Sequence, residues 1–223
     1  MLKLNMNVNL NAAKERAFKE EKIAELNAKD PVSLKVDWGP LAVGGSTHKT
    51  RELTQVSPQC YELKLTSQGY ALPVVFMFAG GVPLTLGSLI MSGGSISETG
   101  LTLVAFGLLF SAVGYMLWRD ITRPVVFDLE RGRHWRGADD EAHGADSVAL
   151  SELHAIQLIS EWVVQKGHRQ RRSTNFTSYE LNLVRVDGSR LNVMDHGDLR
   201  SVRATAERLS ALLELPVWDL ILY

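Results

Sequence analysis

The sequence predicts a membrane α+β protein, in which a transmembrane helical hairpin is joined to a curled antiparallel sheet capped by a C-terminal helix. Three observations predict this class. Two apolar runs of membrane-spanning length, residues 72–91 and 101–118, follow each other closely. Several segments after these runs alternate apolar and polar residues with the period of a strand. A final segment has its apolar residues at helical spacing.

The two apolar runs lack charged residues. No Asp, Glu, Lys or Arg occurs between residues 65 and 97, or between residues 99 and 118. A bilayer core about 30 Å thick needs about 20 apolar residues in a helix. One central charge would oppose insertion by about 2.5–3.5 kcal/mol. We therefore expect a transmembrane hairpin, residues 71–118, rather than two buried helices of a soluble protein.

Basic residues set the expected orientation of this hairpin. The link at residues 92–100 contains Glu98 and no Lys or Arg, whereas basic residues precede the first run and five arginines lie within residues 119–138. Because positive charge is retained in the cytoplasm, we expect a two-pass protein with both termini cytoplasmic. The residues expected at the inner membrane interface are Tyr70, Trp118, Arg119 and Arg123.

Few polar residues lie inside the two runs. Pro83 predicts a kink in the first helix, because it removes one backbone hydrogen bond. Gly107, Ser111 and Gly114 place small residues along one side of the second helix, where they would pack against the first helix or against a second copy of the hairpin. Neither run contains an ionisable residue, which argues against a proton pump, an ion channel or a charge-coupled transporter.

Residues 1–52 are expected to form an N-terminal extension. Residues 1–10 alternate strictly and predict a strand, and residues 12–29 are strong helix formers preceded by Asn11 as an N-cap. This helix could lie on the membrane, on the domain or on a partner, or form a solvated extension. Residues 32–38 alternate again and predict a second strand.

Residues 53–70 are expected to contain a strand that leads to the membrane, and residues 119–223 a cytoplasmic domain. Alternation predicts strands at residues 61–65, 125–129, 134–136, 148–165, 179–186 and 191–193. A change of alternation predicts a bend at residues 151–153 and a slip at Leu183/Val184. Asp187-Gly188 predicts a tight turn, and Asp198 an N-cap for a helix that Pro216 ends.

Composition and motifs exclude several function classes. A net charge of −1 gives no field that favours nucleic acid, and Cys60, as the single cysteine, excludes an internal disulfide. The glycines at residues 44–45 lack the context of a phosphate-binding loop. His143 lies among acidic residues at 138–147, which we interpret as a flexible turn rather than a metal site. The other histidines considered, His48, His154 and His196, are interpreted as ordinary residues, so no catalytic residue, metal or cofactor is expected.

One strongly basic segment remains as a candidate contact surface. Each basic residue near an anionic membrane surface contributes about 1 kcal/mol to binding. The segment at 166–172 could therefore dock on lipid, bind an acidic protein partner, or be only a solvated hairpin tip. Its candidate binding residues are Lys166, His168, Arg169, Arg171 and Arg172.

The order of these elements resembles the bacterial pleckstrin-homology-like (PH-like) membrane proteins, and the layout is similar to that of the photosystem I assembly factors of cyanobacteria and plastids. The resemblance rests on residues 125–135, 148–158 and 179–193, and on the helix from Asp198. It covers roughly residues 53–215. It implies a small curled PH-like sheet, capped by one helix, after a transmembrane hairpin in the inner membrane, with no catalytic signature.

Two functions are compatible with these features. The first is a non-enzymatic binding or scaffold module of the bacterial inner membrane, whose partners are the lipid bilayer and a protein. The alternative is an immunity protein against a membrane-targeting bacterial toxin. Self-association through the hairpin would suit either function. Catalysis is disfavoured, because no nucleophile–base pair, metal spacing or phosphate loop is found in the sequence.

Overall fold

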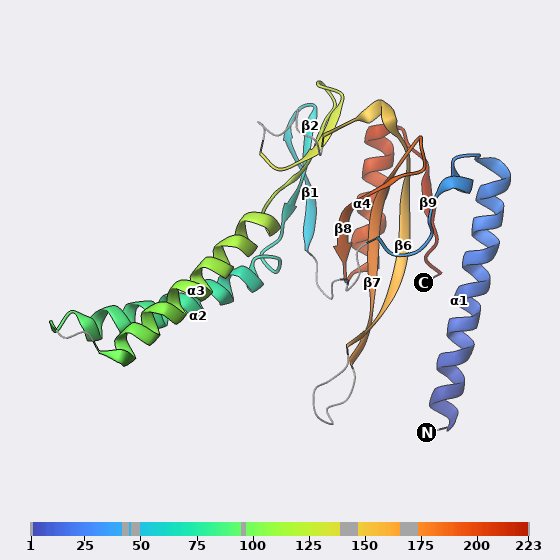
Figure 1. The fold of residues 1–223 in the computed structure, drawn as a ribbon. Coiled ribbons are helices and arrows are strands. Elements are labelled where there is room, and N and C mark those ends of the chain that lie inside the picture. Colours follow the sequence, from blue (N-terminus) through green and yellow to red (C-terminus); the bar gives the residue numbers. More distant parts are fainter. Residues whose placement is uncertain are drawn as a thin grey trace.

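The computed structural model describes residues 2–41, 45, 50–94, 97–138, 147–165 and 174–222. Figure 1 shows a long N-terminal helix, a projecting helical hairpin and two sheets. The helices are α1 (Leu2–Lys29), α2 (Ala71–Met91), α3 (Glu98–Ile121) and α4 (Leu199–Leu213). The strands are β1 (Arg51–Ser57), β2 (Cys60–Leu65), β3 (Val125–Asp128), β4 (Arg133–Arg136), β5 (Val148–Ala149), β6 (Leu153–Gln165), β7 (Thr174–Arg185), β8 (Arg190–His196) and β9 (Val217–Asp219).

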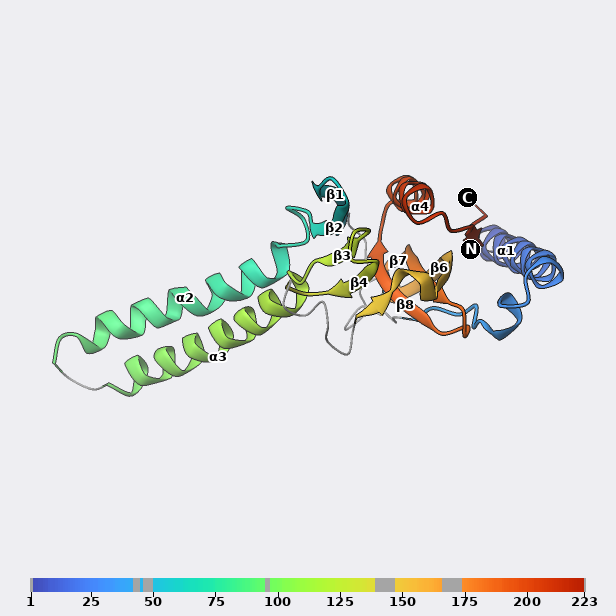
Figure 2. The ribbon, with the colours of Figure 1, turned by 90° about the horizontal axis from the view of Figure 1, so that it is seen from above.

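Helices α2 and α3 form an antiparallel hairpin that projects away from the sheets (Figures 1 and 2). By length and composition, both helices could cross a membrane. The second helix extends beyond the predicted run at both ends, and Ser97 caps its start. The Ser97 Oγ atom accepts a hydrogen bond from the Gly100 amide at 3.0 Å, which satisfies one of the free amides at the helix start.

Glycines at seven-residue spacing bring the two helices into close contact. A Cβ atom on Gly80 would lie only 2.4 Å from the backbone nitrogen of Ser111, so the two backbones touch there. Small residues permit such an approach, and a spacing of seven keeps the contact on one face of each helix. The strip of small residues on α3 therefore packs against α2 of the same chain. The buried glycines are Gly80 and Gly87 in α2, and Gly100, Gly107 and Gly114 in α3.

The outward faces of the hairpin are apolar and exposed. Phe78 is 69% exposed, Leu89 is 68% exposed and Met116 is 69% exposed. Water-soluble proteins rarely expose contiguous apolar surface of this extent. Within the described chain, nothing else covers these side chains.

The first sheet has the order β1-β2-β3-β4-β5, and every pair in it is antiparallel. Strand β2 precedes the hairpin and β3 follows it. These two strands are bonded neighbours, in which Leu63 pairs with Val125 and Tyr61 with Phe127. The hairpin is therefore an insertion between two paired strands, and both of its ends are held at one place.

The second sheet has the order β8-β7-β6-β9. Its strands pair antiparallel except for β9, which runs parallel to β6. The predicted bend before β6 is confirmed as a 3-10 turn at Leu150–Glu152. The N-cap prediction is also confirmed, because the Asp198 carboxylate accepts the Arg200 amide at 3.2 Å at the start of α4.

The main core lies between the two sheets and α4. Leu63, Phe127, Ile156, Leu181 and Leu209 are among its buried side chains. Figure 2 shows α4 on one side of the second sheet and α1 near its other side.

The opposite face of the second sheet is covered by the N-terminal region. Val36 packs there against Ala155 and Val184, and the rings of Trp38 and Trp218 lie 5.5 Å apart. The N-terminal region is thus part of the packed domain.

The predicted strand at residues 1–10 is wrong, because α1 begins at Leu2 and continues to Lys29. Alternation alone does not make a strand without a partner to bond, whereas a helix satisfies its backbone within the segment. Residues 12–29 already favour a helix, and once a helix is nucleated each further residue adds one bond. Ion pairs Glu15–Lys19 and Glu25–Lys29, at 2.9 and 2.8 Å, support its later turns.

The predicted strand at residues 32–38 is also wrong. The segment begins with a 3-10 turn at Ser33–Lys35 and continues without regular structure. Asp30 accounts for this, since its carboxylate accepts the Val32 amide at 3.0 Å and its carbonyl accepts the Ser33 hydroxyl at 2.7 Å. Such local bonds compete with strand pairing.

The predicted slip at Leu183/Val184 is wrong, since β7 pairs in continuous register with β6 there. Both side chains are buried because β7 has a core on each face. The irregular positions lie elsewhere, opposite Leu153/Ala155 and Leu181/Asn182. The sheet is also not a single curled one, because the strands divide into two sheets.

Candidate functional site

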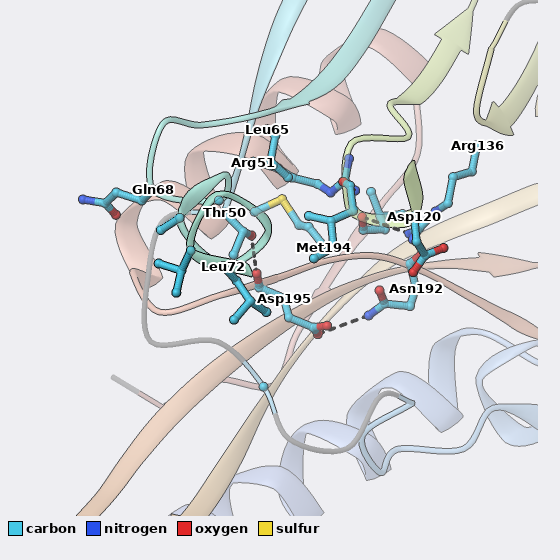
Figure 3. A pocket seen from close by; sticks show the side chains of 16 residues that line it. Thr50, Arg51, Leu65, Gln68, Leu72, Asp120, Arg136, Asn192, Met194 and Asp195 are labelled. Atoms are coloured by element: carbon cyan, nitrogen blue, oxygen red, sulfur yellow. Dashed lines mark hydrogen bonds between the residues drawn. The ribbon is translucent and has the colours of Figure 1, made fainter. Parts of the chain in front are cut away.

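A cavity of about 740 Å³ lies where the hairpin meets the two sheets. Figure 3 shows that its wall combines charged side chains with apolar ones. The apolar side includes Leu72 and Val75 from the start of α2. The charged side chains come from four different elements, namely Arg51 (β1), Asp120 (α3), Arg136 (β4) and Asp195 (β8).

Arg51 fastens the hairpin to the first sheet. Its guanidinium group donates to the carbonyl oxygens of Leu63 at 3.1 Å, Arg123 at 2.9 Å and Ile121 at 2.9 Å. Ile121 ends α3, whose last carbonyls lack partners within the helix and carry partial negative charge. Burial, helped by the positive charge of nearby Arg136 and opposed by the negative charge of Asp120, lowers the pKa of Arg51 to about 10. The group stays cationic at neutral pH.

Arg136 and Asp195 connect the cavity to the second sheet. Arg136 donates to the carbonyl oxygen of Asn192 at 3.0 Å, which bonds β4 to β8. The side-chain amide of Asn192 donates to the Asp195 carboxylate at 3.2 Å. Burial, together with the negative charge of Glu180, raises the pKa of Asp195 to about 6. The Asp195 carboxylate therefore takes up a proton at a higher pH than a free aspartate does.

The predicted interface residues lie beside this cavity. The rings of Tyr70 and Trp118 lie 5.2 Å apart, at the end of the hairpin nearest the sheets. Arg119 is exposed, and Arg123 is partly buried and accepts from Arg51 through its carbonyl oxygen. The structure thus brings the two aromatic residues together at the base of the hairpin. Their placement at a lipid interface stays a prediction.

The predicted basic contact surface lies outside the described residues. Its candidates, Lys166, His168, Arg169, Arg171 and Arg172, fall in the segment between β6 and β7. Residues 139–146 of the acidic segment, which include His143, lie outside the described residues as well. In the described part of the chain, no group of three or more His, Cys, Asp or Glu side chains is placed to hold a metal ion.

A second polar cluster is buried beneath the N-terminal segment. Glu180 is 2% exposed, and its two carboxylate oxygens accept the Leu41 amide at 2.9 and 3.0 Å. Asn182 donates to the same carboxylate at 2.6 Å, and Arg190 donates to the carbonyl oxygen of Gly39 at 2.7 Å. These bonds hold residues 39–41 on the second sheet, so the cluster has a structural role.

Sequence reasoning missed Arg51, Asp195 and Glu180. Arg51 counted only as one positive charge before the first apolar run. Its spacing of two residues from Leu53 was the one local signal, because residues two apart lie on the same face of a strand and Leu53 faces the core. Glu180 gave no such signal, because the N-terminal segment at Leu41 covers it. Asp195 gave none either, because it lines a cavity formed by residues that are distant in sequence.

Two of the described histidines, His154 and His134, make contacts within the packed domain. The Nε2 atom of His154 lies 2.7 Å from the Asp30 carboxylate, which joins the end of α1 to β6. His134 is buried, and burial lowers its pKa to about 4 while its Nδ1 atom lies 3.0 Å from the carbonyl oxygen of Val126. Both contacts are explained by packing.

Comparisons with known proteins bear on the resemblance to the PH-like membrane proteins. No protein-family model matches the chain, and neither curated protein sequences nor solved structures gave a match. The resemblance therefore stays a prediction, which rests on the order of the elements.

Proposed function

We propose that this chain is a non-enzymatic module anchored in the bacterial inner membrane, where it presents its two-sheet domain on the cytoplasmic side to a protein partner or an anionic lipid. The observation that carries the proposal is the apolar, exposed outer surface of the hairpin. Phe78 and Leu109 are 69% and 60% exposed. Lipid tails around the hairpin would remove the unfavourable contact of these apolar side chains with water.

The pairing of β2 with β3 supports the topology. These strands flank the hairpin and bond to each other, so both ends of a membrane-spanning hairpin would lie on the same side. The arginines that follow α3 favour the cytoplasm for that side. Two sheets around one core, antiparallel except for the β6–β9 pair, together with a C-terminal helix, are compatible with the PH-like resemblance.

The anchor is tested by cell fractionation with an alkaline carbonate wash. We expect the protein to stay in the membrane pellet and to be released only by detergent. Phe78→Arg combined with Leu109→Arg should move it toward the soluble or aggregated fraction, because each charge in a span costs about 2.5–3.5 kcal/mol. The matched control is Leu34→Arg combined with Val186→Arg, which changes two exposed apolar residues outside the hairpin. Wild-type protein in the soluble pool without detergent would overturn the anchor.

The orientation is tested separately. A reporter inserted in the link between α2 and α3 should behave as periplasmic. Cytosolic behaviour of that reporter would leave the anchor intact and overturn only the orientation.

The contact role of the basic segment is tested by charge reversal. Replacing its four Lys and Arg residues by Glu should reduce flotation of the detergent-purified protein with phosphatidylglycerol liposomes and reduce recovery of protein partners. Unchanged binding would remove the segment from the proposal. The control reverses four basic residues that are exposed elsewhere, namely Lys14, Arg16, Lys35 and Arg200.

A further inference from the structure

The described residues that line the cavity at the base of the hairpin carry balanced charge. Two guanidinium groups and two carboxylates line it, and they lie close enough to influence one another. Arg136 affects both Arg51 and Asp195 electrostatically, and Asp120 affects Arg51. A ligand that complements this wall needs one negative and one positive group, because a single charge would be repelled by one of the two pairs.

The cavity is also placed at a particular depth of the hairpin. Leu72 lies in the first turn of α2 and Asp120 in the last turn of α3, and both line the cavity. The aromatic pair of Tyr70 and Trp118 lies at the same end. If the hairpin spans the bilayer as proposed above, this end lies where lipid headgroups and aromatic belts are found.

The wall changes from polar to apolar toward the hairpin. Leu72 and Val75 are 52% and 61% exposed, and they continue the apolar outer surface of α2 from the cavity. A ligand with a polar head and an acyl chain would match this change. The volume of about 740 Å³ lies within the range of about 300–1,000 Å³ that ligand pockets occupy.

We propose that this cavity binds the headgroup of a phospholipid that carries both a phosphate and a primary amine, as phosphatidylethanolamine does. The phosphate lies toward the guanidinium groups of Arg51 and Arg136. The ammonium group lies toward the carboxylates of Asp120 and Asp195, and one acyl chain follows Leu72 and Val75 along α2. This inference rests on the proposed membrane anchor.

The chemistry distinguishes this lipid from its common relatives. A phosphatidylglycerol headgroup carries the phosphate alone and would leave both carboxylates without a cation. A phosphatidylcholine headgroup has the same net charge, but its trimethylated nitrogen has no N–H to donate to a carboxylate. Selectivity for the primary amine therefore reports on Asp120 and Asp195 directly.

The test purifies the protein in detergent with an equimolar mixture of dioleoyl phosphatidylethanolamine, phosphatidylcholine and phosphatidylglycerol, and weighs the bound lipid by native mass spectrometry. We expect phosphatidylethanolamine to be enriched over the other two. Asp120→Asn should reduce this preference by about fivefold, as should Asp195→Asn. The double variant should prefer phosphatidylglycerol, since the charged groups that then remain among the described lining residues are the two arginines.

Two comparisons distinguish a change in lipid recognition from a general effect of removing a carboxylate or of disturbing the fold. Asp187→Asn changes an exposed carboxylate on the β7–β8 turn, away from the cavity lining, and should keep the wild-type preference. Asp120 is exposed, so its substitution leaves the fold intact even if Asp195→Asn does not. Equal retention of the three lipids, or an unchanged preference in Asp120→Asn, would overturn the proposal.

Two further outcomes are distinguishable. If soluble phosphoethanolamine displaces the bound lipid, the site belongs to a free phosphoamine and the lipid assignment is wrong; continued retention of the lipid supports it. If the carbonate wash retains the protein in membranes but the lipids bind without selectivity, this inference fails and the anchor stands. If the wild-type protein is soluble without detergent, both fail.

Discussion

The guanidinium group of Arg51 donates a hydrogen bond to the carbonyl oxygen of Ile121, the last residue of α3, at 2.9 Å. This bond joins the first strand of the domain to the end of the hairpin, 70 residues later in the chain. Arg51 is 8% exposed, so water competes little for the contact. The hairpin is therefore fastened to the domain at a defined position.

Arg51→Met should lower the free energy of unfolding by about 2–4 kcal/mol. The variant leaves three carbonyl oxygens without their charged donor, and each unsatisfied buried group costs about 1–3 kcal/mol, of which water entry recovers part. Denaturant unfolding of the detergent-purified protein measures the change. Arg51→Lys should lose less stability than Arg51→Met, because the lysine ammonium group keeps the positive charge although it lacks the planar set of donors of a guanidinium group. The exposed Arg119→Met is the control, and an equal loss there would contradict the assignment.

Gly80→Ala should destabilise the hairpin, whereas Gly81→Ala should not. A Cβ atom on Gly80 would lie 2.4 Å from the backbone nitrogen of Ser111, while a Cβ atom on Gly81 meets nothing within 4 Å. Overpacking of this kind costs about 1–3 kcal/mol, and the neighbouring change should stay within about 1 kcal/mol. Thermal unfolding in detergent compares the two variants. Similar behaviour of the pair would mean that the helices do not approach at Gly80.

Asp195→Asn should change stability in a pH-dependent way. Because burial raises the pKa of Asp195 to about 6, the folded state holds its proton more tightly than the unfolded state, where the pKa is near 3.8. The stabilisation present at low pH is therefore lost as the pH rises from about 4 to 6. Across this range, the free energy of unfolding of the variant should rise by about 1 kcal/mol relative to that of wild type, a value that allows for screening by solvent.

Asp187→Asn should change stability with pH in the direction opposite to that of Asp195→Asn. Its carboxylate accepts the Ser189 hydroxyl at 2.6 Å, and this bond lowers the pKa of Asp187. The variant should thus lose stability relative to wild type as the pH rises past about 4. Urea unfolding at several pH values measures both variants. Curves of the same sign would contradict the proposed environments.

Glu180→Ala should release the N-terminal segment from the second sheet. The carboxylate is the acceptor for the Leu41 amide at 2.9 and 3.0 Å, and its removal leaves that amide unbonded to the sheet. We expect faster limited proteolysis within residues 36–41, located by mass spectrometry of the fragments. Glu207→Ala, at an exposed position on α4, should be cleaved at the wild-type rate. Equal protection of the Glu180 variant would show that Val36 and Trp38 hold the segment alone.

The sequence predicted those elements whose signals are local. Absence of charge located α2 and α3, and alternation located β2, β3, β4 and much of β6, β7 and β8. Strand β1 was missed because Thr54-Gln55 interrupts its pattern, and β9 because three residues carry no period. The parallel pairing of Ile156 with Val217 depends on the chain returning across α4, which no local pattern encodes.

The cavity could not be predicted because its four charged residues come from distant parts of the chain. Arg51 and Asp195 are brought together only when β1 and β8 lie at the same end of the two sheets, where the Thr50 hydroxyl donates to the Asp195 carbonyl oxygen at 2.6 Å. The binding role of residues 166–172, the immunity alternative and self-association through the hairpin stay predictions.

The insertion of the hairpin between β2 and β3 also constrains how the protein is made. During translation, the nascent β1–β2 ribbon emerges long before β3, its other neighbour in the first sheet. The edge of β2 that pairs with β3 stays unpaired while both helices are synthesised. If the helices enter lipid, it also stays unpaired while the translocation machinery inserts them. If the helices do enter lipid, the first sheet can be completed only after insertion, since β3 pairs with Leu63 only when α3 has returned to the starting side.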